Sequence, residues 1–144
     1  MARDYDFISV SPQCWIGTAV MILLVPFPWL CGCFFAALVH ELFHCLALFL
    51  CGERIYHIQI GWNGARIDTG NLTDGKMILC ALAGPFGGLL LLLVVRQFPR
   101  LAVCGLFQTL FNLLPIYPLD GGRALHAFAS LCSQGIMKIK ISCK

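Results

Sequence analysis

Charged residues are scarce in this sequence. Asp, Glu, Lys and Arg make up only 12% of its 144 residues, whereas 59% of the residues are hydrophobic. A soluble domain typically carries about 25% charged and about 45–50% apolar residues. The composition therefore excludes an ordinary soluble domain and indicates an integral membrane protein whose first partner is the lipid bilayer. The net charge is only +3 and no basic stripe is present, so nucleic acid is not expected as a partner.

Signals for a disulfide framework, for repeats and for secretion are also lacking. The nine cysteines are odd in number and mostly lie inside apolar segments, where they are expected to act as small packing residues. No internal repeat, low-complexity region or linker divides the chain, so residues 1–144 are expected to form a single membrane domain. The first ten residues, MARDYDFISV, lack the basic region of a signal peptide, so we expect the first apolar run to remain as a membrane anchor.

Long apolar runs make up most of the sequence. They cover about residues 13–28, 29–51, 76–95 and 101–114, which predicts an all-α membrane protein of about four transmembrane helices. Residues 52–75 differ, because they are polar, contain the alternating stretch RIYHIQI and continue into WNGARI with an Asn-Gly turn signal. This pattern predicts a small interfacial β-hairpin between the second and third helices. Such a hairpin could also pair with an extended strand of a protein partner.

The basic residues favour one orientation in the membrane. With the N-terminus inside, only Arg96 and Arg100 lie outside, and the other eight basic residues lie on the cytoplasmic side. These eight are Arg3, Arg54, Arg66, Lys76, Arg123, Lys138, Lys140 and Lys144. Because cytoplasmic loops are enriched in Lys and Arg, both the N-terminus and the C-terminus are predicted to be cytoplasmic in a multi-pass protein.

The second apolar run contains the stretch VHELFHCLAL, with His40, Glu41 and His44 in an H-E-x-x-H pattern. Placing ionisable side chains inside a membrane helix costs about 2.5–3.5 kcal/mol on insertion scales, so they are expected to have a function. On a helix, His40 and His44 lie on one face, where two imidazoles can chelate one zinc ion. The neighbouring Glu41 can accept a proton from the attacking water, as in metalloproteases.

A hydrolytic zinc site needs a third protein ligand, because such sites typically combine three ligands with one open position. Asp120 is the best candidate by position, since it lies in PLDGG, where proline and glycine interrupt the helical pattern at membrane depth. His126 is a competing candidate and His57, in the interfacial loop, is a weaker one. Asp120 could alternatively act as the N-cap of a helix that begins at Gly121.

HELFH followed by FNLLPIYPLDGGRAL resembles the site-2 protease family of intramembrane zinc metalloproteases. The similarity is greatest to its compact branch, typified by the stage IV sporulation protein FB. The resemblance implies that His40, His44 and Asp120 bind one Zn²⁺ per chain and that Glu41 is the catalytic base. It also implies that Asn112 engages the substrate or the developing oxyanion.

The resemblance covers about residues 30–132, which it implies to be a three-helix catalytic core, and AGP in the third apolar run matches a recurrent family feature. It implies regulated intramembrane proteolysis of transmembrane protein substrates in a bacterial cell membrane. A catalytically inactive zinc-binding membrane scaffold or a transporter-like protein is the alternative. The retained Glu41 disfavours an inactive scaffold, and the lack of repeated halves disfavours a transporter.

Overall fold

A computed structural model describes residues 8–61, 64–70 and 72–142. The elements follow the order β1 (Ile8–Val10), α1 (Pro12–Leu24), α2 (Phe27–Leu50), β2 (Ile55–Gly61), β3 (Gly64–Thr69), α3 (Asp74–Leu90), the short 3₁₀ helix η1 (Leu91–Val94), α4 (Pro99–Asn112) and α5 (Asp120–Ser142). The prediction of a mainly helical chain with a small sheet between the second and third helices is confirmed.

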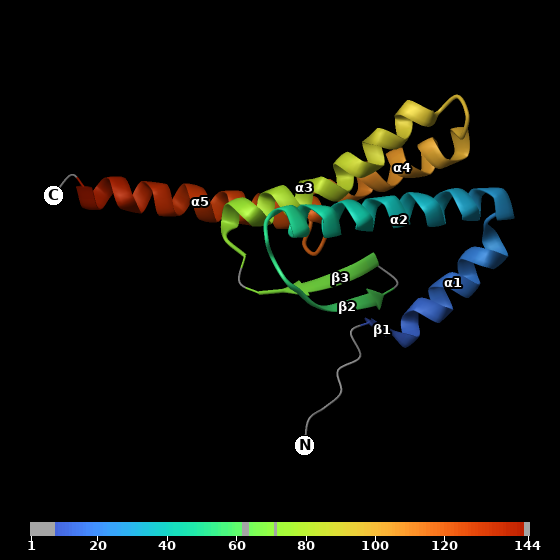
Figure 1. Cartoon of the computed structure of the whole chain (residues 1–144), viewed down its shortest axis with the longest axis horizontal. Helices are drawn as coiled ribbons and strands as arrows, with labels where there is room; N and C mark the ends of the chain where they lie inside the picture. The colour runs from blue at the N-terminus through green and yellow to red at the C-terminus, as the bar shows by residue number, and fades with distance from the viewer. Residues whose placement is uncertain (1–7, 62–63, 71, 143–144) are drawn as a thin grey trace, which may run out of the picture.

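The helices α2, α3 and α4 pack against one another, and α5 packs against α3. Figure 1 shows α2, α3 and α4 running side by side, with the sheet set to one side of α2 and α5 extending beyond the bundle toward the C-terminus. The end of α2 is sharply defined, because Gly52 adopts a left-handed backbone (φ 70°) and the Glu53 N–H donates to the Leu48 carbonyl at 3.0 Å. This capping pattern turns the chain out of the helix and into β2.

The sheet has the order β1-β2-β3, with β1 parallel and β3 antiparallel to the central strand β2. The sequence pattern does not predict β1, because three residues are too few for a periodic signal. The Asn-Gly turn signal falls on residues 62–63, outside the described part of the chain. Ile58 pairs with both Ile8 and Ile67, so a proline there would break the whole sheet.

Two helices in the described part of the chain are long and apolar enough to cross a membrane, against about four predicted. They are α2 and the continuous segment Asp74–Val94 formed by α3 and η1. The helices α1 and α4 have 13 and 14 residues, so each rises only about 20 Å and is shorter than the roughly 30 Å hydrocarbon core. Proline limits both, with Pro26 following α1 and Pro99 opening α4.

The apolar surface of these helices faces outward. Only 22% of the most apolar window of α2 and 33% of that of α3 are buried, unlike the core helix of a soluble protein. Large side chains such as Phe49 and Leu93 are 78% and 80% exposed. The helices contact each other through small residues instead. A Cβ added to Gly88 would collide with Thr109 Oγ1, and one added to Gly105 would lie 3.0 Å from the Gly88 carbonyl. Contacts between small residues are typical of helix packing in membranes.

Candidate metal centre

The helix α2 places His40 and His44 one turn apart on the face that packs against α3. His40 is only 2% exposed, and the two imidazole rings meet edge to face with their centroids 4.8 Å apart. Their Nε2 atoms lie 3.1 Å from each other. The i, i+4 spacing in the sequence therefore brings two nitrogen ligands to one point inside the bundle.

The third side chain, Asp120, is the first residue of α5. Its Oδ2 atom lies 3.0 Å from His40 Nε2 and 3.2 Å from His44 Nε2, across 80 and 76 positions of sequence. The Arg123 N–H donates to the Leu119 carbonyl at 2.9 Å, so Leu119 precedes the first turn of the helix. Leu119 is therefore the N-cap residue, and Asp120 follows it as the first helical residue. The Asp120 carboxylate contacts the two histidines instead of capping the helix.

The two glycines after Asp120 allow the first turn of α5 to pack closely against the preceding segment 113–119. A Cβ at Gly121 would collide with the Leu113 carbonyl, and one at Gly122 would lie 2.5 Å from the backbone carbon of Ile116. Any other residue at these positions would push the first turn of α5 away from the segment 113–119. The two glycines of PLDGG therefore determine where the Asp120 carboxylate lies.

The donor set fits a metal ion. The three atoms form a triangle with sides of 3.0, 3.1 and 3.2 Å. Tetrahedral zinc with ligands at about 2.0–2.1 Å would space them about 3.3–3.4 Å apart. The His44 Nδ1–H donates to the Cys80 carbonyl at 2.7 Å, which leaves the Nε2 lone pair facing the triangle. His40 Nδ1 is buried without a hydrogen-bond partner among the described residues. Converging lone pairs and a carboxylate favour a cation at their centre.

Gly84 on α3 closes the site from the side opposite α2. A Cβ there would collide with His44 Nε2 and lie 2.7 Å from His40 Nε2. In the sequence this glycine stands out only as part of the AGP feature, and the contact explains why the position carries no side chain. The Cys80 carbonyl lies one turn earlier on α3 and orients the His44 ring by accepting its hydrogen bond. Because it is a main-chain group, no pattern of side chains could reveal it.

We expect Gly84→Ala to lower zinc affinity by about 10–100-fold, the range seen when residues that orient metal ligands are changed. The added methyl group displaces both imidazoles from the triangle. Gly75→Ala is the matched control, because it lies on the same helix and its Cβ would meet nothing within 4 Å. Competition titration with a zinc indicator measures both variants, and equal affinity of Gly84→Ala and the control would contradict this packing.

The other residues considered from sequence lie outside the converging group of three, although Glu41 adjoins it. Glu41 is half-buried beside His40 on α2, and Asn112 is the half-buried last residue of α4, directly before the segment that leads to Asp120. His57 on β2 instead lies 3.4 Å from Asp68. His126 is exposed on α5. Among the described residues, His40, His44 and Asp120 are the group of three whose ligand atoms converge.

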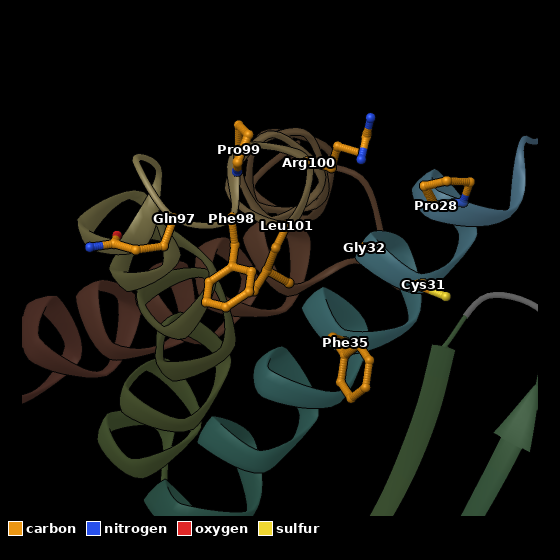
Figure 2. A pocket seen from close by; sticks show the side chains of 9 residues that line it. All are labelled: Pro28, Cys31, Gly32, Phe35, Gln97, Phe98, Pro99, Arg100 and Leu101. Carbon is orange, nitrogen blue, oxygen red and sulfur yellow. The ribbon is translucent and has the colours of Figure 1, made fainter.

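A groove of about 370 Å³ also lies between the N-terminal ends of α2 and α4. Its apolar lining includes Phe35, Phe98 and Leu101, as Figure 2 shows. None of the three converging side chains lines this groove, so the groove is separate from the candidate metal centre.

Comparison with solved structures identifies the fold. The chain is similar to the structure described as "Site-2 Protease from Methanocaldococcus jannaschii", with a TM-score of 0.70 and 23% identity over 85% of this chain and 67% of that chain. The chain has the site-2 protease fold. No family model and no curated protein matches the sequence. The fold implied by the two sequence motifs is confirmed, and the assignment to the compact sporulation branch stays a prediction.

Within this site-2 protease fold, the three converging side chains come from the two segments that carry the resemblance in sequence. HELFH supplies the histidines from α2, and PLDGG supplies the carboxylate from the start of α5. The packing of both α2 and α5 against α3 brings these distant segments together.

Proposed function

We propose that this chain is an intramembrane zinc metalloprotease, an endopeptidase that hydrolyses peptide bonds in or near transmembrane segments of other membrane proteins. The observation that carries the proposal is the convergence of His40, His44 and Asp120 within 3.2 Å of one another, with Glu41 adjacent in the same helix. Three ionisable side chains, His40, Glu41 and His44, lie on α2, which has membrane-spanning length, and they are costly there unless they serve chemistry. The site-2 protease fold supports the same conclusion.

The membrane placement rests on the exposed apolar surface. We place α2 and the segment Asp74–Val94 across the bilayer, because both have spanning length and most of their apolar side chains face outward. We further propose that α1 and α4 complete a multi-pass domain with both termini in the cytoplasm. Leu23 on α1 is 83% exposed, and Phe107 on α4 is 69% exposed, as expected of side chains that contact lipid.

The residues of the site have distinct roles in the proposed reaction. His40, His44 and Asp120 would hold one Zn²⁺, which when bound supplies a Lewis acid and lowers the pKa of a coordinated water toward about 7. The Glu41 carboxylate accepts the proton of the attacking water and later transfers it to the leaving amine nitrogen. The hydrogen bond from His44 to the Cys80 carbonyl keeps that imidazole oriented during the reaction.

Two further roles concern the substrate. The Asn112 side-chain amide would donate a hydrogen bond to the developing oxyanion, since it ends α4 directly before the segment that carries Asp120. The substrate itself must unwind locally, because a transmembrane helix covers its own peptide bonds with internal hydrogen bonds. Cleavage is therefore expected where a substrate helix contains residues that weaken it, such as glycine or proline.

The protein reconstituted in vesicles with a single-span substrate tests this function. We expect cleavage within or next to the substrate's transmembrane segment, its loss after treatment with a membrane-permeant zinc chelator, and its recovery on adding zinc. The cut site is read by mass spectrometry of the products. Cleavage that continues at full rate in the zinc-free protein would refute the proposed chemistry.

A further inference from the structure

Two cysteines on different helices lie in direct contact away from the metal centre. Cys33 on α2 and Cys104 on α4 have their Sγ atoms 3.1 Å apart, although 71 positions separate them in sequence. The Cys104 thiol also lies 3.9 Å from the Trp29 carbonyl, to which it can donate. Cys104 is buried, whereas Cys33 is exposed.

The backbone at this crossing allows the approach. Gly32 carries no side chain, and a Cβ there would lie 3.3 Å from Cys104 Sγ and 3.3 Å from the carbonyl carbon of Arg100. The Cys104 sulfur therefore sits over the α2 backbone. Forming a disulfide bond of about 2.05 Å would require the two sulfurs to close by about 1 Å. The neighbouring Cys31 is different, because Figure 2 shows its sulfur pointing away from Arg100 and Leu101 on α4.

Both sulfurs lie near the same end of the bundle. Cys33 is six residues after the start of α2 and Cys104 is five residues after the start of α4, so each lies within about 10 Å of that end. In the orientation favoured by the basic residues, this end faces the compartment outside the cytoplasm. Disulfides form and persist in such oxidising compartments.

We propose that Cys33 and Cys104 are a disulfide site that covalently joins α2 to α4. The reaction is a thiol–disulfide exchange with an exchangeable disulfide as the oxidant. The accessible Cys33 thiolate attacks the oxidant, forms a mixed disulfide and releases one thiol. Cys104 then attacks the Cys33 sulfur and releases the second thiol. The new S–S bond replaces two S–H bonds, and both electrons and both protons end on the two thiols of the reduced oxidant.

The linkage has a defined structural consequence. It closes a loop that contains the H-E-x-x-H segment and α3, and it fixes the α2–α4 crossing without touching His40, His44 or Asp120. Bound zinc should therefore be unchanged in the oxidised protein. Because a long closed loop restricts the unfolded chain, we expect the unfolding temperature to rise by about 10 °C on oxidation.

The test uses the full chain in detergent, treated with 2,2′-dipyridyl disulfide, alkylated with N-ethylmaleimide, digested and sequenced by mass spectrometry. We expect a peptide linked through Cys33 and Cys104 as the main intramolecular product, lost on reduction. Cys31→Ser, changed two residues away on the same helix, should keep the linkage and the rise in unfolding temperature, whereas Cys33→Ser should lose both.

Quantitative alkylation of Cys33 and Cys104 after oxidation would overturn the proposal, and so would a dominant link through Cys31. The wild-type measurement needs no substitution, so it decides the question even if a variant fails to fold. The disulfide and the proposed proteolysis are tested independently. Absence of the linkage would leave the metal centre unaffected, and a protein without zinc could still form the linkage.

Discussion

Glu41→Gln is expected to reduce cleavage by about 10²–10⁴-fold, the usual contribution of a positioned general acid or base. The amide is nearly isosteric with the carboxylate but cannot accept the proton of the attacking water. His40, His44 and Asp120 keep their mutual distances of 3.0–3.2 Å, so zinc should stay bound. The measurement compares initial cleavage rates in vesicles with zinc content determined by mass spectrometry of the same preparation.

The only other glutamate in the chain provides the matched control. Glu53 forms an ion pair with Lys76 at 2.7 Å, outside the three converging side chains, so Glu53→Gln should cleave at close to the wild-type rate. Cleavage retained by Glu41→Gln with zinc in place would reject Glu41 as the base. A wild-type protein that binds zinc but cleaves no membrane substrate would instead favour the inactive scaffold.

Asp120→Ala is expected to weaken zinc binding by more than about 100-fold, because it removes one of three protein ligands. The carboxylate lies within 3.2 Å of both histidine Nε2 atoms, and the described residues place no other acid in that group. Dialysis against a zinc buffer followed by metal analysis gives the occupancy of each variant.

Replacement of the competing histidine is the control for this prediction. His126→Ala should retain the zinc occupancy of the wild type, since His126 is exposed on α5 and lies outside the converging group. Full occupancy in Asp120→Ala together with loss in His126→Ala would transfer the third ligand to the histidine. Full occupancy in both variants would place the zinc elsewhere in the chain.

The parts of the fold that follow from local periodicity could be predicted from the sequence. The apolar runs at 29–51 and 76–95 correspond to α2 and to the segment Asp74–Val94, with ends shifted by one or two residues. The alternation in RIYHIQI corresponds to β2. The spacing in H-E-x-x-H predicts a shared face, and the Nε2 atoms of His40 and His44 lie 3.1 Å apart.

Features that depend on distant packing could not be predicted in the same way. The strand β1 has three residues and exists because it pairs with β2. The helix α5 extends from Asp120 to Ser142, beyond the last of the four apolar runs, so hydrophobic runs alone did not predict it. The Cys80 carbonyl and the bare backbone at Gly84 are main-chain features, which residue types alone do not reveal. Its position in the PLDGG break and the resemblance to a known family both suggested Asp120 as a ligand, but only the fold places it beside the histidines.

X-ray absorption at the zinc edge, combined with metal analysis of the purified wild-type protein, tests the central claim most directly. The claim is that two histidines and one aspartate hold a single zinc ion. We predict about one zinc per chain, surrounded by nitrogen and oxygen atoms at about 2.0–2.2 Å and by no sulfur. The chain contains nine cysteines, which offer an alternative set of ligands. Zinc–sulfur distances of about 2.3 Å, or a protein that retains no zinc, would contradict the account.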